Sequence, residues 1–386
     1  MTAPDPAHAP AASPPPVPFF PPDLFAADRR VLLDLLRRIA LAPEQRFILG
    51  EHTRELELRL RRLYGAEDVV ACSSGTSALT LILTALGVRA GDEVVVPALG
   101  CAPLAACVAN LGAVPVFADV DPYTLVADPG QVERRITSRT AAIVPAHLFS
   151  VMADMPRFAD LARRYGVRLL EDSAVAQGAV LDGRPAGLWG EAGLFSFVQV
   201  KSFGMPGEGG VVVTRDPELG RLVRMLRNHG QDGERRFVHH LVGHNSRFDE
   251  IQAAFQCHRL AGLGARLRRR ATVAEYYTAQ LAPLAEYGVR TPPPGREGRC
   301  HYVYTLLAER RDELAAHLRE RGVGSHVYYP NALPRQPAFA PYTAPGDRWP
   351  HAERAARTML SLPLHPQLTD RQVAHVAAAV RSFALS

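Results

Sequence analysis

Between residues 67 and 215, short apolar runs alternate with segments whose apolar residues follow a helical period. Runs that read as strands lie at 69–72, 93–96, 114–118, 142–145, 167–170, 193–200 and 210–214. Helical segments separate the first five of these runs at 77–86, 102–110, 130–136 and 156–165. Strands joined by helices of this length predict an α/β fold whose central sheet is mostly parallel and covered on both faces.

The chain has 386 residues, more than one typical domain, so we expect two folded units. Residues 1–22 are too rich in proline for a helix and read as a flexible or extended arm. A connector at 291–298 precedes a second set of elements, with strands at 302–307 and 325–329 and helices at 312–321, 351–360 and 370–383. We predict a large domain at 23–260, including N-terminal helices, and a small C-terminal domain at 261–386.

Charge and cysteine content argue against several classes of protein. The net charge is +5, and its densest run, at 266–270, reads as a solvated helix face rather than a nucleic-acid site. Five cysteines without a CxxC pair suit a reducing cytoplasm and argue against a zinc site. No apolar run reaches the roughly 20 residues that a membrane-spanning helix needs. We expect a cytoplasmic protein that binds no metal, nucleic acid or membrane.

Lys201 is the single lysine of the chain, although lysine and arginine together number 44. Arginine keeps its proton in proteins, whereas a desolvated lysine can become neutral and act as a nucleophile. A lone lysine is therefore a candidate for the one reaction that a guanidinium cannot perform, the formation of a Schiff base with a carbonyl. A surface lysine is the alternative explanation.

Three groups of polar residues follow strand-like runs, the positions where open α/β sheets bind their ligands. The first group, CSSGTSAL at 72–79, has Gly75, Thr76 and Ser77 where a helix begins. Free N–H groups and the helix dipole at such a point suit a phosphate. An ordinary helix cap made of serine and threonine is the alternative.

The second group, LLEDSAVAQGA at 169–179, brings Glu171 and Asp172 to a strand end. One of these carboxylates is a candidate partner for a protonated pyridine nitrogen, and a surface aspartate is the alternative. The third group, GLFSFVQVKSFGMPGEGG at 193–210, contains Ser196 and Lys201 among three phenylalanines whose packing favours a neutral amine. An anion cradle, an acid and an amine, in this order, are what pyridoxal phosphate (PLP) requires.

The same residues lie in longer stretches with a family resemblance. From about residue 19 to the C-terminus the chain resembles the DegT/DnrJ/StrS family of PLP-dependent sugar aminotransferases. The matching stretches include SSGTSALTLILTALGVRAGDEVVVPAL, GAVPVFADVDPYTLVADP, EDSAVAQGA, FSFVQVKSFG, GHNSRFDEIQAA, VYYP and LSLPLHPQLT. The resemblance implies PLP-dependent fold type I, with a large domain around a mostly parallel sheet and a smaller C-terminal α/β domain.

The resemblance also implies roles for particular residues. Lys201 would hold PLP covalently and then carry a proton between the cofactor carbon and the substrate carbon. Asp172 would keep the pyridine nitrogen protonated, and Gly75, Thr76 and Ser196 would form the phosphate cradle.

Asn245 matches a family residue that reaches the phosphate from the neighbouring subunit, so a homodimer with active sites at its interface follows from the resemblance. A turn residue after Gly243 is the alternative explanation for Asn245. Arg247, His326 and Tyr328 are candidates for contacts with the substrate, and each of them has an equally good structural explanation.

The chain departs from the family pattern at three positions near the expected ring. Val175 replaces the usual glutamine that bonds the ring hydroxyl, and Gln177 replaces the usual histidine. Residues 175 and 177 of an extended segment would point to one side, so Gln177 is a candidate to supply the missing amide contact. Cys101 replaces an aromatic residue that commonly stacks on PLP, which would loosen the ring's packing or make room for a different substrate.

The function implied is transamination through the PLP and pyridoxamine phosphate (PMP) forms of the cofactor. Glutamate or glutamine would supply the amino group, and the acceptor would be a ketone on a nucleotide-linked sugar or a cyclitol in amino-sugar, antibiotic or other secondary metabolism. Two enzymatic alternatives are a sugar dehydratase and an aminobenzoate-type synthase of the same family. Dehydratases of the family replace the lysine with histidine, so Lys201 argues against the first. A catalytically silent regulatory or scaffolding homologue is an alternative of another class.

Overall fold

The computed structural model describes residues 16–149 and 151–386. Its largest sheet has seven strands in the order β1-β9-β8-β5-β4-β2-β3. Their bounds are Asp68–Cys72 (β1), Glu93–Pro97 (β2), Val114–Ala118 (β3), Thr140–Ile143 (β4), Arg168–Asp172 (β5), Ala192–Ser196 (β8) and Gly210–Thr214 (β9). Strand β9 runs antiparallel to both neighbours, and the other pairs are parallel. The prediction of a mostly parallel α/β sheet is confirmed.

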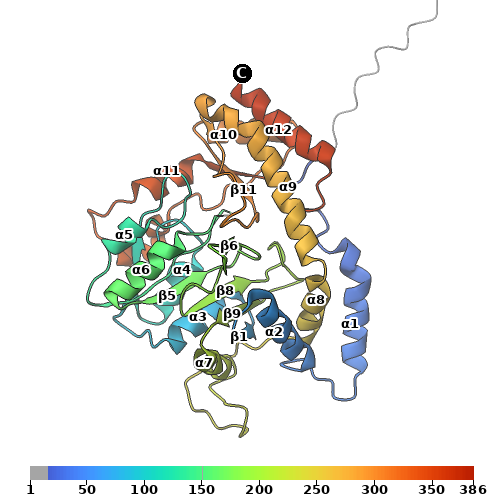
Figure 1. Cartoon of the computed structure of the whole chain (residues 1–386), viewed down its shortest axis with the longest axis vertical. Coiled ribbons are helices and arrows are strands. Elements are labelled where there is room, and N and C mark those ends of the chain that lie inside the picture. The colour runs from blue at the N-terminus through green and yellow to red at the C-terminus, as the bar shows by residue number, and fades with distance from the viewer. Residues whose placement is uncertain (1–15, 150) are drawn as a thin grey trace, which may run out of the picture.

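Helices follow most of the strands and pack on the sheet (Figure 1). They are α3 (Gly75–Ala85), α4 (Pro103–Asn110), α5 (Pro129–Glu133), α6 (Met155–Tyr165) and α7 (Pro217–Arg227). Helix α3 contacts β8 and β9, while α2 (Glu51–Tyr64) contacts β1. All residues of β2, β8 and β9 are buried, as expected for strands covered on both faces.

Helices also connect the sheet to the C-terminal part of the chain (Figure 1). Helix α1 (Arg29–Leu41), which follows η1 (Ala26–Asp28), packs on α8 (Glu250–Leu260), and the long α9 (Leu263–Leu281) leads away from α8. A second, antiparallel sheet consists of β10 (Val289–Arg290), β11 (Tyr304–Ala308) and β12 (Met359–Leu362). The neighbouring helical elements are η2 (Ala282–Tyr287), α10 (Arg311–Glu320), η3 (Leu333–Arg335), η4 (Pro337–Tyr342), α11 (Pro350–Thr358) and α12 (Asp370–Ala384).

Two hydrophobic clusters support the folded parts. The larger surrounds the seven-stranded sheet, and the smaller lies mainly between 273 and 383. Tyr302 and Trp349 nevertheless pack with the larger cluster, so the boundary at 260 stays a prediction. Of the predicted arm, residues 1–15 lie outside the described residues. Val17 in the described portion is fully buried and forms a bridge with Val323.

Three strand or helix assignments from the sequence are wrong in part. The strand expected at 193–200 ends at Ser196, and a loop follows to β9. The strand expected at 325–329 is reduced to a single bridge between His326 and Ser361. The helix expected at 351–360 ends at Thr358, and the chain continues as β12. The short hairpin of β6 (Val180–Leu181) and β7 (Arg184–Pro185) was not expected.

The sheet's topology places several predicted residues at one edge. Strands β1, β5 and β8 run in the same direction, so their carboxyl ends lie together. Gly210 of β9 is paired with Cys72 on one side and with Ser196 on the other. Asp172 is the last residue of β5. The edge therefore gathers the loop before α3, Asp172 and Ser196.

Within residues 16–149 and 151–386, no helix is long and apolar enough to cross a membrane. The same residues contain no group of three or more histidine, cysteine or acidic side chains arranged to hold a metal ion.

Candidate active site

Lys201 lies on a turn after β8, five residues beyond the strand end. Its N–H donates to the Val198 carbonyl at 2.9 Å, and its carbonyl accepts from the Gly204 N–H at 2.9 Å. Its Nζ lies 4.8 Å from the centre of the Tyr302 ring. Burial lowers the pKa of Lys201, and nearby Cys101 and Asp172 offset part of this effect. Burial thus favours the neutral amine that a nucleophile needs.

Asp172 presents a buried carboxylate at the end of β5 that forms no direct ion pair, although Lys201 lies near it. The residue is 6% exposed, and its Oδ1 accepts a hydrogen bond from the Ala174 N–H at 3.0 Å. Burial raises the pKa of Asp172, and the described residues give it no ion-pair partner. A protonated pyridine nitrogen would supply the missing positive charge. The donor set at this position therefore fits the ring of PLP.

Glu171, the other carboxylate of the strand, has a structural role. Successive strand residues point to opposite faces, so Glu171 is directed away from the Asp172 side. Its carboxylate accepts from the N–H groups of Gly187 at 2.8 Å and Gly190 at 3.2 Å. His147 Nε2 lies 3.1 Å from the same carboxylate, and His147 Nδ1 accepts from the Ala153 N–H at 3.1 Å. The pair anchors the loops beside Asp172.

The start of α3 forms a narrow cradle against the end of β8. Ser74 caps the helix by accepting a hydrogen bond from the Ser77 N–H at 3.0 Å. The leading N–H groups of a helix, here those of Gly75 and Thr76, have no partner within the helix. A β-carbon added to Gly75 would lie 3.0 Å from the Cβ of Ser196, so only glycine leaves this space open. The cradle fits the phosphate of PLP.

Asn245 and Arg247 lie on a segment beside this cradle. Ser246, between them, bonds Ser73 through both backbone and hydroxyl groups, with the hydroxyl oxygens 3.0 Å apart. Asn245 is exposed, and its Oδ1 accepts from the Nε of Arg247 at 3.1 Å. In the described residues these two side chains contact each other rather than Asp172 or Lys201. The role expected for each stays a prediction.

Gln177 is fully buried behind Ser196. Its Nε2 donates to the carbonyls of Ala174 at 3.2 Å and Ser196 at 3.0 Å, and its Oε1 has no partner among the described residues. Val175 is buried, and its carbonyl accepts from the Cys300 thiol. The Gln177 amide nitrogen is thus occupied by the backbone, while its oxygen is free. Its contact with the cofactor remains a prediction.

Aromatic residues from the C-terminal part surround Lys201. The hydroxyl groups of Tyr302 and Tyr328 lie 3.3 Å apart, and the Tyr328 ring is 4.6 Å from that of His326. The Phe19 ring is tilted against the His326 ring, with the two ring centres 5.5 Å apart. The structure therefore brings two of the candidate substrate residues, His326 and Tyr328, into one cluster that reaches Lys201 through Tyr302. Burial raises the pKa of Tyr328 and lowers that of His326, so both are uncharged at neutral pH.

Three residues near Lys201, namely Cys300, Tyr302 and Tyr329, were not predicted from the sequence to belong to the site. Tyr302 and Cys300 lie in a stretch without any recognisable chemical pattern. Tyr329 follows Tyr328 in the VYYP stretch and has a positive φ of 56°. Strained backbone of this kind recurs at functional sites, but it is visible only in a structure. Cys101, expected near the ring, has its Sγ 3.9 Å from Asp172 Oδ2.

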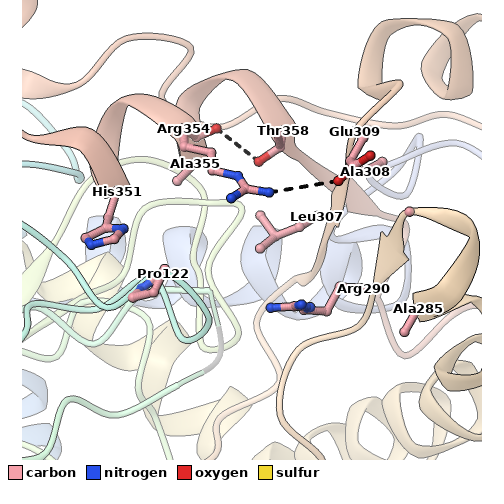
Figure 2. A pocket seen from close by; sticks show the side chains of 11 residues that line it. Pro122, Ala285, Arg290, Leu307, Ala308, Glu309, His351, Arg354, Ala355 and Thr358 are labelled. Carbon is pink, nitrogen blue, oxygen red and sulfur yellow. Dashed lines mark hydrogen bonds and ion pairs between the residues drawn. The ribbon is translucent and has the colours of Figure 1, made fainter.

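A pocket of about 140 Å³ lies away from Lys201, between β11 and α11 (Figure 2). Arg354 and Glu309 face each other across it at 3.9 Å, and His351 and Arg290 lie on its walls. None of the sequence-predicted site residues lines this pocket. The nucleophile, the acid and the cradle all lie elsewhere. We therefore place the candidate active site at Lys201.

Comparisons with known proteins identify the family of the chain. The profile of the DegT/DnrJ/EryC1/StrS aminotransferase family matches residues 35–381. The chain is 38% identical to the dTDP-3-amino-3,4,6-trideoxy-alpha-D-glucose transaminase of Streptomyces venezuelae, across 97% of each chain. It is also 38% identical to the pleiotropic regulatory protein of Geobacillus stearothermophilus, across 92% of this chain and 93% of that one.

A solved structure shows the same fold. The crystal structure of NtdA from Bacillus subtilis with bound cofactor PMP has a TM-score of 0.89 and 28% identity to this chain. The match covers 96% of this chain and 86% of NtdA. The fold expected from the sequence is confirmed.

Proposed function

This chain belongs to the DegT/DnrJ/EryC1/StrS aminotransferase family, and from that premise we propose that it is a PLP-dependent aminotransferase. One observation carries the proposal above all: the only lysine of the chain is desolvated next to the buried carboxylate of Asp172, which forms no ion pair, and it follows Ser196 of the proposed phosphate cradle by five residues. A surface lysine left over from an arginine-rich composition would have no reason to lie there.

When bound, PLP supplies an aldehyde that takes up an amino group and a ring that delocalises the electron pair left by a departing proton. Lys201 would hold the cofactor and, once released, move a proton to and from the substrate carbon. Asp172 would keep the ring nitrogen protonated. Gly75, Thr76 and Ser196 would orient the group through its phosphate. The apolar and aromatic walls would exclude water and keep the amine neutral.

We propose glutamate or glutamine as the amino donor and a ketone on a nucleotide-linked sugar as the acceptor. The support is the name of the Streptomyces venezuelae relative, which is a transaminase for a dTDP-linked aminosugar. Amino-sugar formation in antibiotic or related biosynthesis is the corresponding context. A cytoplasmic location is also proposed, supported by the five cysteines, all of which are free thiols.

We propose a homodimer in which Asn245 reaches the phosphate site of the neighbouring subunit. Support comes from the segment that projects beyond α7 and returns to α8 (Figure 1). Its apolar residues Phe237 and Val242 are 72% and 94% exposed, so the segment offers apolar surface that a second subunit would cover. Asn245 lies on the same segment and is itself exposed.

The regulatory alternative keeps one specific observation in its favour, the name of the Geobacillus relative. A silent homologue has no need for a desolvated lysine or for a buried carboxylate that forms no ion pair. Both features are present here, so we favour the enzyme.

Trapping experiments distinguish the two functions. Purified protein given PLP should absorb in the visible range, and borohydride should fix the cofactor to Lys201, as located by peptide mass spectrometry. Lys201→Ala should lose the fixed adduct, and so should Lys201→Arg, which keeps the charge. Glutamate should then convert the wild-type spectrum to that of PMP. A stable adduct that no amino donor converts would support the regulatory role instead.

A further inference from the structure

Three arginines gather around a pocket next to Lys201. The pocket has a volume of about 270 Å³, and its walls include Arg259, Arg266, Arg270 and Lys201. Residues of the N-terminal segment between 20 and 28 close one side, and residues 199–202 and 365–367 contribute the rest. The solvated helix face expected at 266–270 is thus wrong for Arg270, which is only 8% exposed. Arg266 is half-buried.

The guanidinium groups of this pocket have unused hydrogen-bond donors. The Nε atoms of Arg259, Arg266 and Arg270 are buried and have no partner within the described part of the chain. The same holds for the hydroxyl of Ser202. Nε of a guanidinium always carries a hydrogen, so each is a donor without an acceptor. Buried donors are nearly always paired in folded proteins, so this concentration of donors favours a ligand with acceptor atoms.

The pocket also has an excess of positive charge. Arg259 pairs with Asp28 at 2.6 Å, which places one carboxylate of the N-terminal segment on one of the three arginines. Arg266 and Arg270 form no ion pair with any described carboxylate, and Arg270 instead donates to the Tyr302 carbonyl at 2.9 Å. Burial lowers the pKa of Arg266 and of Arg270 to about 10, and both stay protonated at neutral pH. Two uncompensated cations favour an anionic ligand.

Tyr302 links this pocket to the reacting amine. Its carbonyl accepts from Arg270, and its ring lies 4.8 Å from the Nζ of Lys201. The phosphate cradle of Gly75 and Ser196 is a separate feature, at the start of α3. An anion bound among the arginines would therefore lie near Lys201 without occupying the cofactor's phosphate site.

We propose that the arginine pocket binds the carboxylate of the amino-acid donor and holds the donor beside Lys201. This inference rests on the proposed function. The planar fork of a guanidinium matches a carboxylate in geometry as well as charge. The volume of about 270 Å³ falls below the range of about 300–1,000 Å³ typical of sites for larger ligands, which suits an amino acid better than a nucleotide-linked sugar.

The test compares Arg266→Met with Arg268→Met. Arg268 is on the same helix but is exposed and does not line the pocket, so it is the matched control. Binding of 2-oxoglutarate, the keto acid of the donor, is measured by calorimetry on the PLP-loaded protein. The glutamate dependence of PMP formation is measured by absorbance. We expect Arg266→Met to raise both dissociation constants about tenfold or more, with PLP affinity unchanged and Arg266→Lys intermediate.

Two results would overturn the proposal. Equal constants for the Arg266 and Arg268 variants would show that the pocket does not hold the donor. The nucleotide dTDP represents the phosphate-bearing part of the acceptor. If Arg266→Met weakens inhibition by dTDP and leaves 2-oxoglutarate binding unchanged, the arginines bind a phosphate of the acceptor. If thermal denaturation shows that Arg266→Met is unfolded, Arg266→Lys decides by the same two measurements.

The outcome is separable from the proposed function. If the wild type never forms PMP, the proposed aminotransferase function is refuted. If the wild type nevertheless binds 2-oxoglutarate more tightly than Arg266→Met, the proposal that the arginine pocket binds the donor carboxylate is supported. If the wild type and Arg266→Met form PMP from glutamate equally well, the aminotransferase function is supported and the proposed role of the pocket is refuted.

Discussion

Gly75 and Ser196 stand so close that a β-carbon on Gly75 would lie 3.0 Å from the Cβ of Ser196. The first is the leading residue of α3 and the second is the last residue of β8, so neither has much freedom to move. Packed interiors rarely accept so short a contact without a shift of the neighbouring atoms. The gap between the two residues is where the phosphate cradle is proposed.

Gly75→Ala should therefore weaken PLP binding by about tenfold or more, equivalent to about 1.4 kcal/mol. The added methyl group would push Ser196 or the helix start out of position and narrow the cradle. Titration of the apoprotein with PLP, followed by absorbance, measures the effect. Ala85→Ser, at the far end of α3, is the control and should leave the affinity unchanged. An unaltered affinity in Gly75→Ala would mean that the phosphate binds elsewhere.

Asp172→Asn should stabilise the apoprotein at neutral pH by about 1–3 kcal/mol, because it removes a buried charge that lacks a partner. Burial raises the folded-state pKa of Asp172. Folding then favours the protonated carboxyl, so wild-type stability falls as the pH rises from about 4, the unfolded value, through the higher folded value. The gain in the variant should accordingly vanish near pH 4.

Denaturant unfolding with and without PLP measures both parts of this prediction. PLP should stabilise the wild type more than Asp172→Asn, since only the carboxylate gains an opposite charge from the ring nitrogen. If PLP stabilises both proteins equally, Asp172 does not contact the ring.

The sequence could predict the large sheet because its strands are buried on both faces and therefore read as continuous apolar runs. The same rule failed after Ser196, where Val198 and Val200 prolong the apolar run although the chain has left the sheet. A β-carbon on Gly204 would lie 2.4 Å from the Gln199 carbonyl oxygen, so the chain must double back there. That close approach depends on backbone geometry that apolar periodicity does not encode.

Candidates for the nucleophile, the acid and the phosphate cradle could be named from the sequence because each depends on local sequence at a strand end, and their roles stay predictions. Tyr302 and Arg270 could not, since their roles depend on packing between segments distant in the chain. Arg270 donates to Leu364, 94 residues away, as well as to Tyr302. The run at 266–270 looked solvated because charge patterning carries no information on which arginine faces an interior.

Glu171→Gln should destabilise the protein by about 3 kcal/mol, although Glu171 does not face the proposed ring. A neutral amide accepts more weakly than a carboxylate, and its NH₂ would oppose the N–H donors of Gly187 and Gly190. Glu191→Gln is the control, because Glu191 is partly exposed, accepts a single backbone N–H, that of Leu169 at 2.7 Å, and otherwise pairs with the exposed Arg168 at 3.7 Å. The denaturation midpoints of the two variants should differ clearly. Equal midpoints would show that Glu171 does not anchor the loops beside Asp172.

Mixed dimers test whether Asn245 serves the neighbouring subunit. Lys201→Ala and Asn245→Ala should each be nearly inactive alone. If each active site combines Lys201 of one subunit with Asn245 of the other, a mixed dimer regains one intact site. Activity should therefore return when the two variants are unfolded together and refolded, and light scattering should show a dimer throughout.

The control is a mixture of Lys201→Ala with the double variant Lys201→Ala/Asn245→Ala, which has no intact lysine in any dimer and should stay inactive. Both residues would act within one chain if Asn245→Ala refolded with Lys201→Ala gave no more activity than the separate variants. In that case Ser246, which already contacts Ser73 of its own subunit, would place Asn245 at its own phosphate cradle. The exposed Phe237 and Val242 would then require a different explanation.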